Sequence, residues 1–329
     1  MLKRIAAGAV FLSLILTTSQ AFAVAEAAVP SLIIPPGARA NGMGETYVAL
    51  AEDATAAWWN PGGLAFLKKR NLALMHSQLV PDLASDVYYE FFGYTNEIGN
   101  VGTLAFSLIY LTYGTSVATN VSGEELGTFK SWEASGYASF AMELRKNLGV
   151  GLSMKFIHAD YAPDDFTLEQ LDGTGSSFAV DAGMLWKFPS QRLQAGLAIT
   201  NLGPDIAFID REQSDPLPFT ARAGVAFIPI ADEISNLTIA FDLEQSLVWL
   251  TSDTATKRRS EIYHAGLEYR YVDLIAGRIG YVYDEDGDFN DPTYGLGFIY
   301  KKKLSFDYAN VPQATTLDRV HRWSVYFMF

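Results

Sequence analysis

The sequence predicts an all-β protein: a 14-stranded antiparallel transmembrane β-barrel with an N-terminal plug, or hatch, inside the lumen. Three observations lead to this prediction. Fourteen segments between residues 71 and 329 alternate apolar and polar side chains with a period of two. Most of these segments are nine to fourteen residues long, which suits a tilted strand that crosses a bilayer. The chain ends on Phe329, directly after an amphipathic segment.

Composition excludes several classes of protein. The chain has 329 residues, a formal net charge of −13, 49% hydrophobic residues and 13% aromatic residues. It is too apolar for intrinsic disorder and too rich in β-forming residues for a helical bundle. A protein that binds nucleic acid through its phosphates needs a basic surface, so nucleic acid is excluded as a partner. Cysteine is absent, which excludes disulfides and thiolate metal sites.

The first residues have the pattern of a secretory signal peptide. Lys3 and Arg4 precede an apolar run that ends at Leu16, and Ala21-Phe22-Ala23 fits the small-x-small cleavage pattern. The apolar run is too short to span a membrane comfortably, and no Cys follows it to carry a lipid anchor. We therefore predict three parts, which are a signal peptide (1–23), an N-terminal plug segment (24–70) and an outer-membrane barrel (71–329).

Residues 24–70 lack the period-two alternation. Gly42-Met43-Gly44 predicts a compact turn, and Asp53 begins a short helix that runs through Trp59. A second short helix begins at Pro61, with Asn60 as its N-cap. A compact segment of this length fits inside a wide barrel as a plug, and the alternative is a loosely attached periplasmic extension.

Four consecutive residues are the predicted plug and gating residues. Asn60 caps the turn with its side chain, and Pro61 presets its own backbone angle. Gly62 and Gly63 let the backbone pass close to the barrel wall, where a Cβ would clash.

The barrel strands follow one another to the end of the chain. They are predicted at 71–79, 86–97, 101–113, 131–144, 148–160, 175–188, 192–201, 217–228, 235–245, 259–270, 272–283, 293–301, 303–310 and 320–329. In one of them Trp132 and Phe140 share a face, while Glu133 and Ser139 lie on the other. A soluble β-sandwich with its apolar face inward shows the same alternation. Strand length, the even strand number and aromatic residues near strand ends favour a barrel with its apolar face in lipid.

The longest predicted loops are only moderate in length and leave little room for a large docking surface. They cover residues 114–130, 161–174, 202–216 and 246–258.

The last strand carries a further signal. Trp323, Val325, Phe327 and Phe329 form one apolar face that ends at the terminal residue. This pattern resembles the assembly signal of outer-membrane barrels, which implies that the barrel-assembly machinery is a partner. The alternative is an amphipathic edge strand in a soluble fold.

Motifs for catalysis or metal binding are weak. The four histidines, His76, His158, His264 and His321, lie on different predicted strands without ligand spacing. The acidic run 284–291 lacks the Gly and the bidentate Glu of an EF-hand loop, so a surface loop is favoured over a calcium site. We expect no catalytic residues, no metal site and no cofactor, and we interpret the protein as a non-enzyme.

Charged residues of both signs occupy the polar faces of the strands. The carboxylates are Glu90, Glu133, Glu143, Asp181, Asp242, Glu244, Glu268 and Asp307. Lys155 and Arg322 share the same lining. Arg222, Arg270 and Arg278 are the candidate lumen residues for holding a ligand.

Both ends of the chain resemble one family. At the start, residues 38–44, 47–54 and 59–64 are similar to the amino-terminal signature of PorV/PorQ family proteins, which belong to the FadL-like outer-membrane barrels. The usual Asn-Pro-Ala-Gly-Leu of that signature is changed here to Asn60-Pro61-Gly62-Gly63-Leu64. At the end, residues 304–309 and 321–327 are similar to the last hairpin of the family.

The resemblance implies a barrel in the cell outer membrane of a Gram-negative-type bacterium, in contact with outer-membrane lipid. The first hypothesis is passive passage of hydrophobic or amphipathic small molecules, with a hydrophobic ligand in the lumen. The second is a PorV-like component that binds and shuttles a secreted cargo protein in type IX secretion. The third is a purely structural surface barrel.

Overall fold

The computed structural model describes residues 27–166, 172–190, 192–209, 214–251, 259–287, 289–313 and 317–329. The predicted signal peptide, residues 1–23, lies outside these ranges. Among the described residues, no helix is long and apolar enough to cross a membrane.

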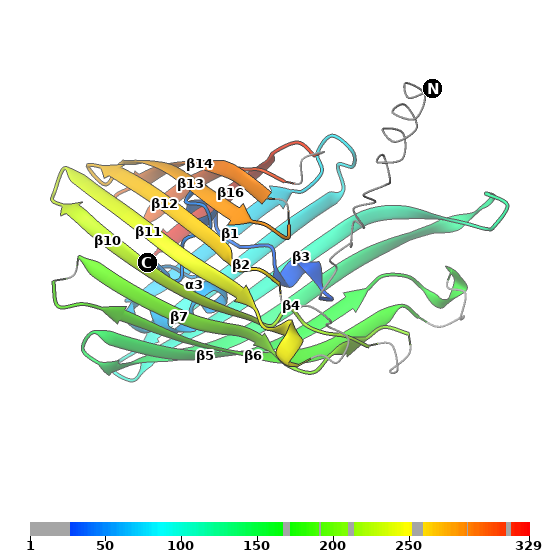
Figure 1. Cartoon of the computed structure of the whole chain (residues 1–329), viewed down its shortest axis with the longest axis horizontal. Helices are drawn as coiled ribbons and strands as arrows, with labels where there is room; N and C mark the ends of the chain where they lie inside the picture. The colour runs from blue at the N-terminus through cyan, green and yellow to red at the C-terminus, as the bar shows by residue number, and fades with distance from the viewer. Residues whose placement is uncertain are drawn as a thin grey trace, which may run out of the picture.

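Fourteen strands form a closed antiparallel barrel, as predicted (Figure 1). They are β1 (Arg70–Gln78), β2 (Val87–Ile98), β3 (Gly102–Thr119), β4 (Glu125–Arg145), β5 (Leu148–Asp160), β6 (Thr174–Lys187), β7 (Leu193–Leu202), β10 (Thr220–Ala231), β11 (Ser235–Ser246), β12 (Ile262–Tyr271), β13 (Ile275–Asp284), β14 (Phe289–Tyr300), β15 (Leu304–Val311) and β16 (Val320–Met328). Each strand pairs with the next barrel strand along the chain, and β1 pairs with β16 to close the ring. Two short strands, β8 (Ile206–Ala207) and β9 (Ser214–Asp215), pair with each other between β7 and β10.

The two ends of the barrel differ in their connections. At the turn end, on the left in Figure 1, strands join through tight turns such as 146–147 and 301–303. At the loop end the connections are longer, such as 79–86 and 247–261. The loop end also contains the short 3-10 helices η3 (Asp164–Phe166) and η4 (Val248–Leu250).

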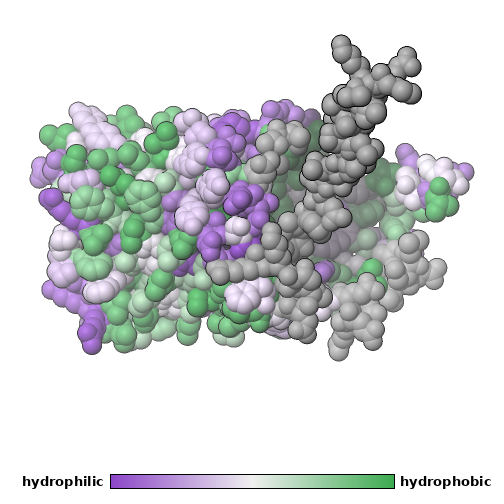
Figure 2. All heavy atoms as spheres, in the orientation of Figure 1, coloured by the Kyte–Doolittle hydropathy of each residue, from purple (hydrophilic) through white to green (hydrophobic). Residues whose placement is uncertain are grey.

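Buried and exposed side chains alternate along each strand. On β4, Glu133 and Tyr137 are buried, whereas Phe140 and Met142 are exposed. The exposed face is apolar over much of the barrel, and in Figure 2 hydrophobic residues cover much of the visible wall between hydrophilic residues at the turn end and others toward the loop end. Because apolar side chains point outward and the sheet closes on itself, the soluble β-sandwich alternative is wrong.

One predicted loop is mainly strand. Residues 114–130 were expected to form a loop, but β3 continues to Thr119 and β4 begins at Glu125. The two strands pair from Thr115 opposite Lys130 to Thr119 opposite Glu125. The prediction failed because this stretch mixes polar and β-branched residues without a clear apolar period, and only pairing with its partner strand makes it extended.

The described residues before β1 form irregular structure with four short helices, η1 (Pro30–Leu32), α2 (Ala38–Gly42), α3 (Ala56–Trp59) and η2 (Pro61–Phe66). We call residues 27–69 the N-terminal segment. Asp53 accepts hydrogen bonds from the backbone N–H and the hydroxyl of Thr55 at the start of α3. Asn60 caps η2 by accepting from the Gly62 N–H at 3.0 Å, as expected. The segment packs against the buried faces of the strands, so the main hydrophobic core joins the segment to β1–β4, β10 and β11.

Candidate functional site

The N-terminal segment contacts the buried faces of the strands through glycine. Nine strand glycines face the segment so closely that a Cβ on any of them would meet its atoms or those of a side chain beside it. This glycine band comprises Gly93, Gly149, Gly151, Gly183, Gly196, Gly224, Gly266, Gly280 and Gly295. The absence of a Cβ lets two backbones approach directly. The band was not among the predicted site residues, although its signal was present in the sequence as glycines on the buried faces of several strands.

Polar side chains of the strands satisfy the backbone of the segment. Asp242 accepts hydrogen bonds from the N–H groups of Tyr47 and Val48 at 2.7 and 2.9 Å. The hydroxyl groups of Ser324 and Thr293 accept from other N–H groups of the segment. An irregular segment cannot pair all its own backbone groups, and a buried unpaired group is costly. The polar side chains on the buried faces of the strands are therefore placed to pair with the backbone N–H groups of this segment.

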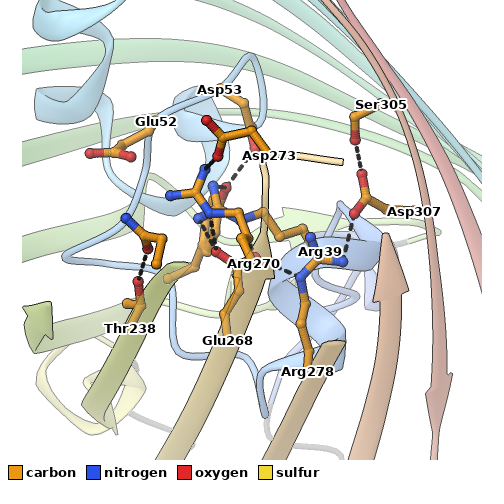
Figure 3. A network of polar contacts seen from close by, with 12 residues as sticks. Arg39, Glu52, Asp53, Thr238, Glu268, Arg270, Asp273, Arg278, Ser305 and Asp307 are labelled. Atoms are coloured by element: carbon orange, nitrogen blue, oxygen red, sulfur yellow. Dashed lines mark hydrogen bonds and ion pairs between the residues drawn. The ribbon is translucent and has the colours of Figure 1, made fainter. Parts of the chain in front are cut away.

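A charged cluster joins the segment to the strands at the turn end (Figure 3). Arg39 of α2 donates two hydrogen bonds to the fully buried Glu268 of β12, at 2.9 and 2.8 Å. Arg278 donates to the same carboxylate at 2.7 Å and contacts Asp307 at 2.6 Å. Arg270 lies 3.4 Å from Glu268. We call these five residues the Glu268 cluster. Three guanidinium groups thus share one carboxylate, and one of them belongs to the segment.

A cavity of about 280 Å³ opens beside the Glu268 cluster. Its lining combines residues of the segment, such as Glu52 and Asp53, with residues of the strands and of the turns at this end. Burial raises the pKa of Glu52, but Lys187 at 3.0 Å and the Arg39 guanidinium outweigh burial and hold this pKa below its ordinary value. The cavity is therefore lined by ionised groups of both signs.

A second polar contact holds the segment near the loop end. The buried carboxylate of Glu133 accepts hydrogen bonds from the Ser31 N–H at 2.8 Å, the Tyr161 hydroxyl at 2.9 Å and the Tyr113 hydroxyl. Beside it, Val29 and Leu32 join a small apolar cluster with residues of β5, β6 and β8. The segment is thus held at both ends of the barrel.

An apolar groove of about 770 Å³ lies on the exposed face across β7 and β10–β13. Leu197, Val225 and Phe241 are among its exposed walls. Its floor includes Gly196 and Gly224, which are register partners. A Cβ on Gly196 would overlap the carbonyl of Val48 in the segment, so the barrel wall is one backbone thick between the groove and the segment.

The predicted plug residues do not all face the barrel wall, because one of the two glycines contacts the segment itself. A Cβ on Gly62 would lie 2.7 Å from the Met184 Cα, so Gly62 faces the barrel wall. Gly63 instead faces Ala51 of the segment itself, which corrects its expected place against the wall. Asn60 donates to the carbonyls of Val48 and Met184, and so joins the segment to β6.

The three arginines predicted to hold a ligand already have carboxylate partners. Arg270 and Arg278 belong to the Glu268 cluster and line its cavity. Arg222 lies elsewhere, where it pairs with Glu244 at 2.7 Å and packs over the ring of Trp58. The structure therefore brings two of the three together.

The four residues predicted as an assembly signal lie on the outer side of β16. Trp323, Phe327 and Phe329 are exposed, and Val325 is half-buried. Phe329 exchanges backbone hydrogen bonds with Arg70, at 3.0 and 3.2 Å, where β16 closes the barrel against β1.

One other charged residue lies on the opposite face of its strand from the face predicted. Glu90 was expected on the polar face, but it lies on the exposed face of β2 and pairs with His76 at 2.8 Å. The alternation of β2 is ambiguous because aromatic residues occupy both of its faces. In the run 284–291, Asp288 lies outside the described residues, and Asp284 pairs with Arg259. Within the described part of the chain, no three acidic or histidine side chains converge as a metal site would require.

Comparison with known proteins identifies similar sequences and folds. The family model described as type IX secretion system protein PorV matches residues 17–253. The crystal structure of the Pseudomonas putida toluene transporter TodX is 12% identical, with a TM-score of 0.58 over 88% of this chain and 96% of that one. The Ralstonia pickettii toluene transporter TbuX is 13% identical, with a TM-score of 0.54 over 89% and 98% of the two chains.

A Pseudomonas aeruginosa FadL homologue is 12% identical, with a TM-score of 0.53 over 89% and 98% of the two chains. None of the curated proteins compared with the chain matches it significantly. At these identities, likeness to the solved structures shows the fold alone.

Proposed function

The chain belongs to the PorV family, and from this membership and its FadL-like fold we propose an outer-membrane barrel that passes hydrophobic or amphipathic small molecules by diffusion. In this proposal the N-terminal segment is a plug inside the lumen, and the cell is a Gram-negative-type bacterium.

The exposed face supports membrane placement. Aromatic and histidine side chains form a row on this face across neighbouring strands, from His76 through Tyr88, Tyr110 and Trp132 to His158. Such amphipathic rings favour the boundary between lipid and water, and girdles of this kind flank the apolar band of membrane barrels. The closed hydrogen-bond ladder leaves no strand edge unpaired within the ring, as lipid requires.

Contacts around the ring support the role of plug. The segment touches the glycine band, Glu268 and Glu133, which lie on strands from β2 to β14. A segment held on so many sides obstructs a straight aqueous path. We therefore propose that solutes pass beside the segment or through a local rearrangement of it.

The observation that carries the proposal is the apolar groove. Its lining is almost entirely apolar, and only one backbone layer separates it from Val48 of the segment. A groove of this character suits a ligand without charge, because burial of apolar surface is its main source of affinity. The names of TodX and TbuX describe toluene transporters, and toluene is such a ligand.

Uptake of a hydrophobic fluorescent probe into lipid vesicles tests the proposal. Val225→Trp fills the groove, while Ile279→Trp adds the same bulk at an equally exposed position of β13 outside it. We expect Val225→Trp to slow protein-dependent uptake several-fold and Ile279→Trp to leave it unchanged. Equal uptake by both variants and the unmodified protein would exclude the groove, and uptake equal to that of empty vesicles would exclude passage.

A second function is favoured by the family match and by the projecting β3–β4 hairpin. We propose as this alternative that the protein binds an exported cargo protein at the cell surface during type IX secretion. Deletion of the gene in its host would then leave cargo unattached to the surface. If the protein were only a transporter, the same deletion would leave cargo attachment unchanged. Expression of the Val225→Trp variant in the deletion strain should restore cargo attachment although the variant slows probe uptake, and this result would separate the two functions.

A further inference from the structure

The β3–β4 hairpin projects beyond the barrel at the loop end (Figure 1). Pairing of β3 with β2 ends where Val87 lies opposite Tyr113, but pairing of β3 with β4 continues to Thr119. From Thr115 to Thr119, β3 therefore has a strand neighbour on one side only. We call this stretch the β3 edge.

Two hydrogen bonds establish which backbone groups face outward. The Thr115 N–H donates to Asp86 on the outer side at 2.9 Å, whereas the Asn120 N–H donates across the hairpin to the Glu124 carbonyl. Successive N–H groups of a strand point to opposite sides. The Val117 N–H therefore points outward like that of Thr115, toward the open side of the hairpin.

Between Thr115 and Ala118 the β3 edge has no charge, proline or bulge, although the register with β4 shifts on either side of this stretch. Natural proteins protect exposed edges with charged side chains, proline or bulges. The sequence Thr-Ser-Val-Ala-Thr has no charge and no proline, and the Val117 side chain is exposed. β4 likewise extends beyond its last pair with β5, at Trp132, but Phe166 packs beside this stretch against Phe129 and Gly127.

Carboxylates lie at both ends of the β3 edge. Asp86 contacts its base, and Glu124 and Glu125 lie at the hairpin tip. Among the described residues none of these three forms an ion pair, and Lys130 is the only basic residue in the projecting part of the hairpin, residues 115–130. Thr115 and Thr119 lie about 13 Å apart along an extended strand. A partner with basic side chains four residues apart would match these charges.

We propose that the β3 edge is a strand-addition site for an extended, basic segment of a secreted polypeptide. The segment adds as an antiparallel or parallel strand, with main-chain hydrogen bonds to β3 and basic side chains near Asp86 and Glu124. This inference deepens the second proposed function and rests on it for the partner's identity. The contacts proposed for binding come from the hairpin and from Asp86, and do not depend on the partner's identity.

Binding of a labelled peptide to the full-length protein in detergent tests the inference. The probe is a ten-residue peptide of alternating Thr and Val with two Lys residues four positions apart, and fluorescence anisotropy gives its Kd. Val117→Pro removes the outward N–H but leaves the pairing with β4, and should weaken binding about tenfold or more. Val117→Ala keeps the N–H and should bind within about threefold of the unmodified protein.

Control peptides separate the two sources of affinity, which are the main-chain hydrogen bonds to β3 and the attraction between basic and acidic side chains. A peptide with N-methyl groups at alternate positions should not bind, and a peptide with Glu in place of Lys should bind at least about tenfold more weakly. The variant with Asp86→Asn, Glu124→Gln and Glu125→Gln should lose this preference. Equal binding by Val117→Pro, or by the N-methylated peptide, would overturn strand addition.

Two further outcomes are decisive. If light scattering shows a dimer that Val117→Pro disperses, while the peptide does not bind, the occupant is a second copy of this chain and the inference is wrong. If the peptide does not bind but gene deletion still abolishes cargo attachment, the second function stands and the β3 edge is not its site. Probe uptake by Val117→Pro should match that of the unmodified protein.

Discussion

Gly42 of the N-terminal segment and Gly295 of β14 face each other backbone to backbone. A Cβ on Gly42 would lie 2.8 Å from the Gly295 Cα, and one on Gly295 would lie 3.0 Å from the Gly42 Cα. Neither position accepts a side chain without movement of the segment away from the strand. The same relationship recurs around the glycine band, so the segment and the barrel wall fit each other along their backbones.

A single methyl group on the band should therefore loosen the segment. Gly280→Ala places a Cβ on the Gly44 amide, and overpacking of this kind costs about 1–3 kcal/mol. Gly277→Ala is the matched control, because a Cβ there meets no atom within 4 Å. We expect trypsin to cleave after Arg39 faster in Gly280→Ala only. Equal cleavage of the two variants would show that the segment tolerates the added volume.

Loss of Glu268 should be more damaging than loss of Arg39. Arg39→Ala leaves Glu268 with Arg278, whereas Glu268→Ala leaves Arg39 and Arg278 buried near each other with one fewer carboxylate. Removal of one partner from a buried ion pair costs about 3–5 kcal/mol. Denaturant unfolding should show the larger loss for Glu268→Ala. A larger loss for Arg39→Ala would contradict the arrangement in the Glu268 cluster.

Acid should weaken the contact between Glu52 and Lys187. The pKa of Glu52 is lowered in the folded protein, so its ionised form stabilises the segment above the ordinary carboxyl pKa of about 4.3. This contribution is lost as the pH falls through the lower pKa of the folded state. Pepsin cleavage of the segment between pH 5 and 2.5 should rise more steeply in the unmodified protein than in Glu52→Gln. Parallel curves would assign the acid response to other groups.

Deletion of Phe329 should impair assembly more than it alters the finished barrel. The residue adds exposed aromatic surface and two backbone hydrogen bonds where β16 meets β1, but it lies outside the lumen. We expect several-fold less heat-modifiable barrel in the outer membrane. Phe298→Ala, which removes an exposed aromatic ring from β14, should assemble normally. Normal levels of a chain that ends at Met328 would contradict the assembly signal.

Removal of residues 30–66 should leave the barrel closed but change its permeability. The fourteen strands carry their own hydrogen-bond ladder, while the segment fills space against their buried faces. Replacement of residues 60–63 by Ala should have a smaller effect in the same direction, because a Cβ at Gly62 or Gly63 meets backbone atoms. Conductance in planar bilayers measures both variants. Unchanged conductance of a folded deletion variant would exclude gating by the segment.

The sequence by itself determined the strand number and the direction of the two faces. Alternation such as that of Glu133 beside Trp132 is a local property of each strand, and a closed ring of such strands has only two faces to assign. The cap at Asn60 was equally local, because the side chain and the N–H that it accepts from are two residues apart.

Only the tertiary structure decided which residues of the site meet. Arg39 and Glu268 are separated by 229 positions, and no local period relates them. The partner of Gly63 proved to be Ala51 and not the wall, because the path of an irregular segment depends on contacts around the whole ring. The hairpin over 114–130 likewise became strand through pairing between β3 and β4. Local patterning fixes which face a residue occupies, but contacts between distant residues depend on how the closed sheet brings them together.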